Sequence, residues 1–146
     1  LINDRLDLAL LCEADGVHLG PDDFPIRAVR QILGPQKLIG ASTGTPAEAR
    51  LAEQEGADYL GIGAVFGTQT KSDAGAAIGL EGLREVVHAT SLPAAAIGGL
   101  SERNLGSTLQ AGAAMACVVS AIAGAGNETQ MTAATRRLVA LCADAG

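Results

Sequence analysis

Aromatic residues are almost missing: the 146 residues include no tryptophan, one tyrosine and two phenylalanines, although 48% of the chain is apolar. The apolar residues are therefore mostly small or aliphatic, and 19 glycines accompany them. This composition excludes a disordered chain and favours an α/β protein whose helices pack closely on a sheet. The length suits one domain, residues 1–146, with a core of its own.

Basic charge is also scarce, because ten Lys and Arg face sixteen Asp and Glu, for a net charge of −6. The basic residues are scattered, which argues against nucleic acid or an anionic membrane as a partner. The most apolar run, residues 111–126, is too short and too rich in small residues to span a bilayer. Cys12, Cys117 and Cys142 have no pairing or metal-ligand spacing, so we expect reduced thiols in a cytoplasmic protein without a targeting segment.

Short apolar runs alternate with helical patterns along the whole chain. The runs do not alternate in polarity, which is typical of strands buried on both faces of a parallel sheet. The first residues read as the end of one more strand. We expect Thr45 and Ser101 to cap the helices that follow them. The pattern predicts strands at 17–19, 37–41, around Gly61, at 93–97 and at 115–119, and helices at 5–12, 25–33, 46–55, 80–89, 101–110 and 128–142.

This alternation predicts an α/β fold of the (β/α)8 TIM-barrel type. A complete barrel of this kind needs about 250 residues. We therefore expect an N-terminally truncated barrel, a single partial TIM-barrel domain over residues 1–146. Its first complete strand would have an unpaired edge, which leaves a homo-oligomer open.

Polar groups follow each expected strand, and in a barrel these positions converge on one mouth. Acidic side chains at Asp4 and at Asp22 or Asp23 could share Mg²⁺, which prefers carboxylates together with phosphate oxygens. Thr68, Thr70 and Lys71 could bind phosphate through two hydroxyls and a charge, although an ordinary polar turn would look the same. Backbone amides near residues 98–99 and 119–120 offer a further anion site. A metal and two anion sites imply two phosphorylated small-molecule substrates, or one diphosphate.

Seven segments together resemble the thiamine-phosphate synthase family. No segment is decisive alone, but their common order along nearly the whole chain is specific. They are Leu-Ile-Asn-Asp-Arg at 1–5, Ala-Asp-Gly-Val-His-Leu-Gly at 14–20, Gly-Ala-Ser at 40–42, Gly-Ala-Asp-Tyr-Leu-Gly-Ile-Gly at 56–63, Thr-Gln-Thr-Lys at 68–71, Ala-Ile-Gly-Gly at 96–99 and Val-Val-Ser-Ala-Ile at 118–122. The resemblance implies a transferase that, with Mg²⁺, joins hydroxymethylpyrimidine diphosphate to thiazole phosphate and releases diphosphate. It also implies that the chain runs from the end of the third barrel strand through the eighth βα unit.

The resemblance assigns roles to individual residues. Asp4 and Asp23 match the family's metal ligands. Asn3, Ser42 and Lys71 match its contacts to the pyrimidine diphosphate, and Lys71 is the residue expected to act in catalysis. The expected thiazole-phosphate contacts are Thr68, Thr70, Gly99, Val119 and Ser120. We interpret His18, in the middle of a strand, as an interior or mouth histidine with a hydrogen-bond partner rather than as a base.

The sequence also departs from the family pattern. The family carries an upstream Gln-x-Arg-x-Lys cluster that grips the diphosphate, and this chain has none. Pro21, Gly44 and Gly67 stand where Gln, His and Pro are usual. Two alternatives therefore stay open: a related thiazole tautomerase, and a non-catalytic phosphate-binding fragment.

Overall fold

The computed structural model describes residues 1–68, 70 and 75–143. Within these ranges six parallel strands form one sheet, in the order β1-β2-β3-β4-β5-β6. The alternating α/β pattern and the additional strand at the start are thus confirmed. The strands are β1 (Ile2–Asn3), β2 (Gly16–Leu19), β3 (Leu38–Thr43), β4 (Tyr59–Ile62), β5 (Ala94–Ile97) and β6 (Met115–Cys117).

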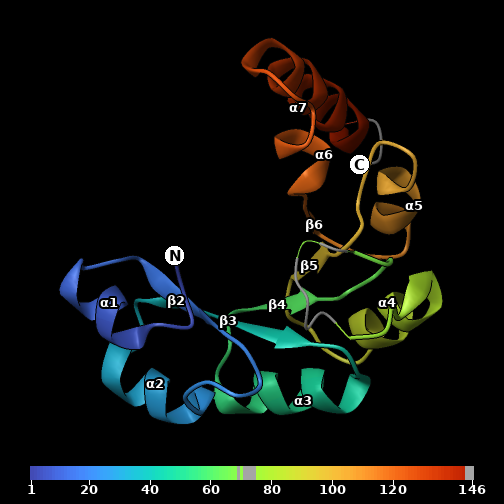
Figure 1. Ribbon diagram of the computed structural model, residues 1–146. Coiled ribbons are helices and arrows are strands. Elements are labelled where there is room, and N and C mark those ends of the chain that lie inside the picture. Colours follow the sequence, from blue (N-terminus) through green and yellow to red (C-terminus); the bar gives the residue numbers. More distant parts are fainter. Residues whose placement is uncertain (69, 71–74, 144–146) are drawn as a thin grey trace.

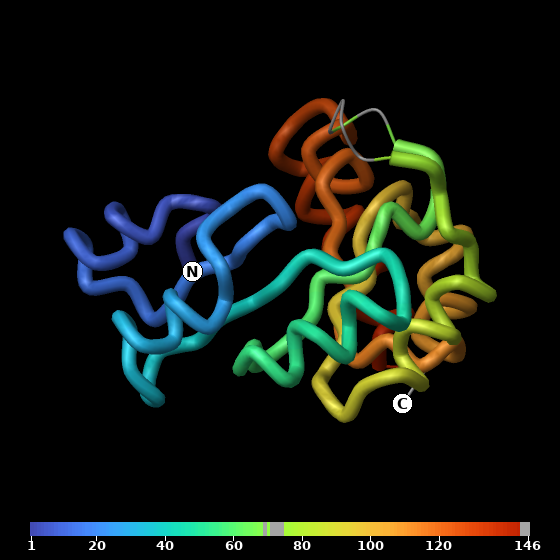
Figure 2. Tube along the Cα trace, turned by 90° about the horizontal axis from the view of Figure 1, so that it is seen from below, coloured from blue at the N-terminus to red at the C-terminus, as the bar shows by residue number. Residues whose placement is uncertain are grey.

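Helices cover one face of this sheet. They are α1 (Leu6–Leu11), α2 (Ile26–Leu33), α3 (Pro46–Glu55), α4 (Gly79–His88), α5 (Leu105–Gln110), α6 (Ser120–Ala123) and α7 (Glu128–Ala143). Figure 1 shows the sheet curled into an arc with α1 to α5 on its outer side, while α6 and α7 form the far arm. The tube in Figure 2 shows the N-terminal segment at the left and the C-terminal helices toward the upper right, and β1 and β6 are the two end strands of the sheet. The fold is a half-barrel whose inner face is open.

The core lies between the outer face of the sheet and the helices. Every second strand residue points toward the helices, which is the expected two-residue period. Val17, Ile39, Leu60 and Ile62 are fully buried there, each with 0% exposure. Burial of a side chain of this kind stabilises a fold by about 1.5–3 kcal/mol. The outer face therefore holds the arc together.

Helix α3 begins as its sequence predicts. The Thr45 hydroxyl accepts a hydrogen bond from the Glu48 N–H at 3.3 Å, and the Glu48 carboxylate accepts one from the Thr45 N–H at 3.1 Å. This is a capping box, with Pro46 in the first turn. Gly56 ends the helix in the left-handed region, at φ 99°.

The expected cap at Ser101 is confirmed in part. The Ser101 hydroxyl accepts a hydrogen bond from the Arg103 N–H at 3.4 Å, and the Ser101 carbonyl accepts one from the Leu105 N–H at 3.0 Å. The Ser101 N–H in turn donates to Oδ1 of Asn104 at 2.8 Å. The regular helix α5 nevertheless begins only at Leu105, after this capped turn.

Strand β4 forms around Gly61, as predicted. It begins at Tyr59 and ends at Ile62, so that Gly63 to Phe66 belong to the following loop. This loop runs beside the end of β5, because the N–H groups of Val65 and Phe66 donate to Ile97 and Gly98 at 2.9 and 3.0 Å. Among the described residues, no helix is long and apolar enough to cross a membrane.

Candidate active site

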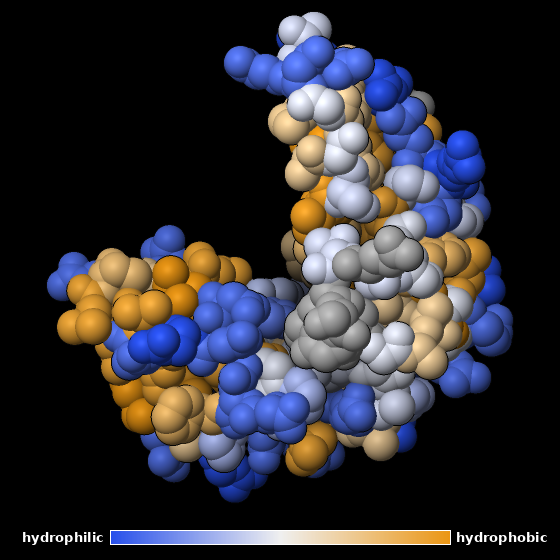
Figure 3. Space-filling model, viewed as in Figure 1, coloured by the Kyte–Doolittle hydropathy of each residue, from blue (hydrophilic) through white to orange (hydrophobic). Residues whose placement is uncertain are grey.

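The inner face of the arc, called the concave face below, carries the strand residues that point away from the helices. These residues include Asn3, His18, Gly40, Ser42, Tyr59, Gly61, Ala95, Ile97, Met115 and Cys117. The strand register places Asn3, His18, Gly40 and Tyr59 at one level, with Ser42 and Gly61 one level nearer the C-terminal ends. Figure 3 shows this side of the molecule hollowed between the α1 arm and the α7 arm. Because the strands are parallel, the described residues that end or follow them lie at the same edge of the sheet.

Asp4 leaves β1 in an unusual backbone conformation. Its φ is 62°, in the left-handed region that residues other than glycine seldom adopt. The Asp4 N–H donates to the carbonyl of His18 at 2.8 Å, which fixes the end of β1 against β2. Asn3 and Asp4 are both exposed. Aspartate adopts this region more readily than most residues, and Glu13 in the turn after α1 also lies there, at φ 52°.

Asp23 lies in the turn that follows β2. One carboxylate oxygen, Oδ2, accepts a hydrogen bond from the Gly20 N–H at 2.7 Å, and the residue is half-buried. This bond holds the carboxylate at the end of β2, next to the strand whose end bears Asp4. Two carboxylates on adjacent strand ends fit Mg²⁺, which takes one or two carboxylates and fills its other positions with water and phosphate oxygens. The part of the chain that the structure describes holds no group of three Asp, Glu, His or Cys side chains that could bind a metal ion. A metal between Asp4 and Asp23 would therefore need water and phosphate oxygens as further ligands.

Ser42 points from β3 toward the concave face and is exposed. Its Oγ lies 3.0 Å from Nε2 of His18, whose Nδ1 lies 2.9 Å from the Tyr59 hydroxyl. The interpretation of His18 as an inner-face histidine with a hydrogen-bond partner is therefore confirmed. Tyr59 was not identified from the sequence as a residue of this face. The available signal is that Tyr59 lies two residues before Gly61 in the same strand, and such residues face the same side of a sheet.

Burial affects the two titratable groups on the concave face near this histidine. Desolvation raises the pKa of the Tyr59 hydroxyl, and the neighbouring Cys117 thiolate would raise it further. Burial likewise raises the pKa of the Cys117 thiol. Both groups therefore keep their protons at neutral pH, and Tyr59 is available as a hydrogen-bond donor.

The loop after β4 lies at the end of the sheet and brings the predicted phosphate ligand Thr68 close to Gly99. The Thr68 hydroxyl accepts a hydrogen bond from the Thr70 N–H at 3.2 Å, which curls this part of the loop. Gly99 packs against the same loop at φ 64°, where an added Cβ would lie 2.6 Å from the Gly67 carbonyl oxygen. Thr68 and Gly99 are thus brought close together. Lys71 lies outside the described residues.

Val119 and Ser120 lie where β6 passes into α6. Val119 is the N-cap residue and Ser120 the first residue of this four-residue helix, and both are exposed. They follow β6, which is the place where the sequence predicts a phosphate site.

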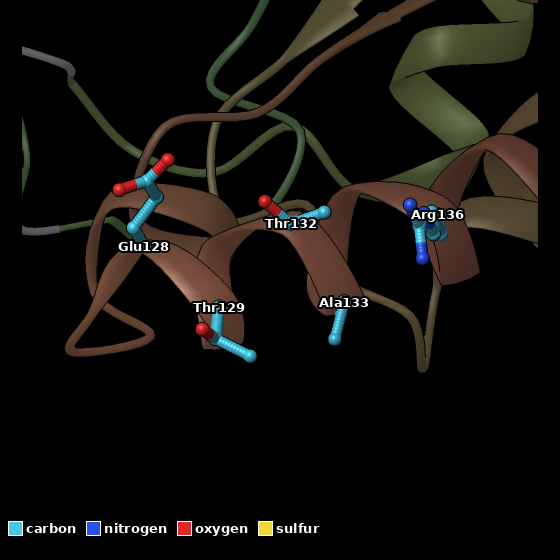
Figure 4. Close-up of a pocket in the computed structure, with 5 residues that line it drawn as sticks. All are labelled: Glu128, Thr129, Thr132, Ala133 and Arg136. Carbon is cyan, nitrogen blue, oxygen red and sulfur yellow. The ribbon is translucent and has the colours of Figure 1, made fainter.

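A separate depression lies on α7. Glu128, Thr129, Thr132, Ala133 and Arg136 line it, and all five project from one helix (Figure 4). None of the residues at the strand ends lines this depression. It is therefore distinct from the concave face.

A family model and several known proteins match this chain over most of its length. A family model described as thiamine monophosphate synthase matches residues 1–122. Thiamine-phosphate synthase from Moorella thermoacetica is 49% identical over 138 residues, which are 94% of this chain and 64% of that protein. The Chloroflexus aurantiacus thiamine-phosphate synthase is 47% identical over 141 residues, 97% of this chain and 63% of its own length.

A solved structure also matches. Thiamine phosphate pyrophosphorylase from Pyrococcus furiosus superimposes with a TM-score of 0.85 at 43% identity, over 98% of this chain and 66% of that protein. The chain thus spans slightly less than two thirds of the length of these relatives. Sequence and fold lead to one conclusion: the chain belongs to the thiamine monophosphate synthase family.

Proposed function

We propose that the protein is a transferase of thiamine biosynthesis that joins hydroxymethylpyrimidine diphosphate to thiazole phosphate. The observation that carries this proposal is the match to thiamine-phosphate synthases at 47% and 49% identity over nearly the whole chain. The convergence of Asn3, Asp4, Asp23 and Ser42 on neighbouring strand ends supports it. The products would be thiamine phosphate and diphosphate.

The reaction breaks one bond and forms another. The bond between the pyrimidine methylene carbon and the diphosphate oxygen breaks, and the electron pair leaves with the diphosphate. The lone pair of the thiazole nitrogen then forms the new carbon–nitrogen bond. No covalent enzyme nucleophile is needed, so catalysis would consist of positioning the substrates and stabilising the leaving group.

We propose that Asp4 and Asp23 hold Mg²⁺. The ion, when bound, would neutralise charge that develops on the departing diphosphate. Asp23 is held for this role by its hydrogen bond from the Gly20 N–H, and its strand is adjacent to the one that ends at Asp4. Asn3 and Ser42 would contact the diphosphate from the same strand ends, and Lys71 would supply a positive charge.

The thiazole phosphate would bind at the other strands. Its donors would be the Thr68 and Thr70 hydroxyls, the Gly99 backbone amide and the amides at Val119 and Ser120. The packing of Gly99 against the Phe66–Gly67 backbone supports a joint site for the first of these groups.

The proposal includes a complete eight-stranded barrel in the full-length protein. The open concave face of the six-stranded sheet and the greater length of the relatives support it. Cys12, Cys117 and Cys142 are free thiols, which supports a reducing compartment such as the cytoplasm.

The roles can be tested by comparing two substitutions in the full-length protein. Lys71→Ala should lower the rate of diphosphate release far more than Ser107→Ala. Ser107 is a suitable control because its hydroxyl donates to the Asn104 carbonyl at 2.9 Å within the turn that opens α5. Equal effects of the two substitutions would contradict the proposed role of Lys71.

A further inference from the structure

The turn between β5 and α5 contains two consecutive backbone N–H groups without a protein partner. They belong to Gly99 and Leu100, and no group in the described part of the chain accepts a hydrogen bond from either. Leu100 is only 4% exposed and Gly99 is half-buried, and N–H groups in such surroundings are almost always paired. Two successive donors just after a barrel strand fit a ligand with several acceptor oxygens, such as a phosphate group.

The direction of each N–H group is determined by the carbonyl in the same peptide plane. In a trans peptide the C=O and the N–H point in opposite directions. The Gly98 carbonyl accepts from the Phe66 N–H at 3.0 Å, and the Gly99 carbonyl accepts from Nδ2 of Asn104, also at 3.0 Å. The first bond therefore directs the Gly99 N–H away from Phe66, and the second directs the Leu100 N–H away from Asn104.

These two bonds matter because the turn contains two glycines. Gly98 and Gly99 have φ of 99° and 64°, and glycine moves between backbone regions at little cost. Without the bond from Asn104, the peptide plane between Gly99 and Leu100 would be free to rotate. The Leu100 N–H would then lose its fixed direction.

Asn104 is itself held in place. Its Oδ1 accepts from the Ser101 N–H at 2.8 Å, so its side chain bridges the two ends of the turn, and its oxygen and nitrogen are distinguished by their partners. Its own carbonyl accepts from the N–H and the hydroxyl of Thr108 at 3.0 and 2.8 Å. Because Thr108 is fully buried, the core fixes the position from which Asn104 reaches Gly99.

We propose that Asn104 is a positioning residue that directs the Leu100 N–H, beside that of Gly99, toward a bound phosphate group. Leu100 is then a further phosphate donor at this strand end. The identity of the ligand as thiazole phosphate rests on the proposed function. The orientation of the Leu100 amide does not, because it follows from bonds within the turn.

Two substitutions at position 104 separate this role from helix capping. Asn104→Asp keeps an oxygen for the Ser101 N–H but cannot donate to the Gly99 carbonyl, whereas Asn104→Ala removes both bonds. Ser101→Ala is the matched control, because it removes the hydroxyl that accepts from the Arg103 N–H at 3.4 Å and leaves the bond to Gly99 in place.

Both substitutions of Asn104 should raise the Kd of the full-length protein for thiazole phosphate by about tenfold or more, and Ser101→Ala should leave it unchanged. Asn104→Ala adds no charge, so a loss shared by both variants is not a charge effect. The Kd for the corresponding thiazole alcohol, which lacks the phosphate, should be the same in all of these proteins.

Thermal unfolding should rank the variants differently. Asn104→Ala and Ser101→Ala should lower Tm because each weakens the cap, whereas Asn104→Asp should change it little. If the Kd for thiazole phosphate followed the order of Tm, or if the phosphate and the alcohol lost affinity equally, Asn104 would have only a structural role and the proposal would be overturned.

The Leu100 amide provides a direct readout in two-dimensional ¹H–¹⁵N NMR spectra of the full-length protein. Saturating inorganic phosphate, and separately thiazole phosphate, should shift the amide protons of Gly99 and Leu100 downfield. In Asn104→Ala the shift of Leu100 should be largely lost, while that of Gly99, which the Phe66 bond directs, should remain. An unchanged Leu100 shift in this variant would overturn the proposal.

The role of Asn104 and the proposed function can fail separately. If the phosphate ligands shift the Leu100 amide of the unsubstituted protein but no thiamine phosphate is formed, the proposed function fails and the role of Asn104 stands. If neither phosphate ligand shifts this amide, the role of Asn104 is overturned whether or not the product forms.

Discussion

Arg30 on α2 forms an ion pair with Asp58, the residue just before β4, with Nη2 and Oδ2 2.5 Å apart. The same guanidinium donates to the carbonyls of Gly34, Lys37 and Gly56, and Oδ2 of Asp58 also accepts from the Ile39 N–H at 2.7 Å. All of these groups lie at the N-terminal ends of the strands, opposite the candidate site. One arginine thus joins the loops that lead into β3 and β4.

Arg30→Ala should lower the free energy of unfolding by about 2–4 kcal/mol, because it leaves the partly buried Asp58 carboxylate without its cationic partner and several carbonyls without their side-chain donor. Urea unfolding measures the change. Arg84→Ala, which removes the exposed pair with Glu81, is the matched control and should cost less than about 1 kcal/mol. If Arg30→Ala lowered the free energy of unfolding as little as Arg84→Ala, Arg30 would not be the residue that stabilises the loops before β3 and β4.

Glu53 on α3 gives a pH-dependent contribution to stability. The Ser91 hydroxyl bonds its carboxylate, the Ser91 N–H donates to it at 3.1 Å, and the Thr90 hydroxyl adds a weaker effect. These bonds, the first of them most, lower the pKa of Glu53 below its ordinary 4.5. Because the folded-state pKa is lowered, the stabilisation is present above pH 4.5 and is lost as the pH falls through the lowered pKa.

The test is thermal unfolding of Glu53→Gln beside the unsubstituted protein from about pH 7 down to about pH 3. We expect the variant to unfold at a lower temperature near neutral pH and the difference to shrink below pH 4.5. A difference that stays constant across the range would show that the charge of Glu53 does not matter.

Gly40→Ala should disturb the concave face, since the new Cβ would lie 2.1 Å from Cζ of Tyr59. We expect a loss of about 1–3 kcal/mol in unfolding free energy, typical of overpacking, and weaker diphosphate binding. Gly106→Ala is the control, because a Cβ there meets nothing within 4 Å. Calorimetry on both variants would contradict this account if Gly40→Ala were as stable as Gly106→Ala.

Asp23→Asn should raise the Mg²⁺ concentration needed for half-maximal activity by at least about tenfold. Substituting a residue that only hydrogen-bonds a metal ligand already lowers metal affinity about 10–100-fold, so the loss of a ligand itself should have at least the smaller of these effects. Asparagine keeps an oxygen that can accept from the Gly20 N–H, so the turn should persist. Asp22→Asn, at the exposed neighbouring carboxylate, should leave the Mg²⁺ requirement unchanged. Equal shifts for the two variants would indicate a general charge effect.

The sequence predicted the features that depend on neighbouring residues. Thr45, Pro46 and Gly56 determine the ends of α3 through local geometry, and the alternation of apolar runs with helices indicated the parallel sheet. The same alternation indicates that Asp4, Asp23 and Ser42 share one end of the sheet, because each follows or ends a strand of the same direction. The cap at Ser101 also forms, but the turn that it opens becomes regular helix only at Leu105, a boundary that the sequence pattern does not reveal.

The remaining features depend on contacts between distant residues. The link from His18 to Tyr59 requires the register of three strands, and the residues lie 41 positions apart. A glycine at position 61 suggests room for a ligand, whereas the structure shows the His18 ring beside it. The course of the loop after Ile62 likewise depends on bonds to Ile97 and Gly98, which belong to a later strand and its turn.

The most direct test of the central claim is product formation by the full-length protein supplied with hydroxymethylpyrimidine diphosphate, thiazole phosphate and Mg²⁺, with each component omitted in turn. We predict equal amounts of thiamine phosphate and diphosphate, formed only when both substrates and the metal are present. Failure to release diphosphate from the complete mixture, or conversion of the thiazole phosphate alone, would contradict the proposed synthase activity.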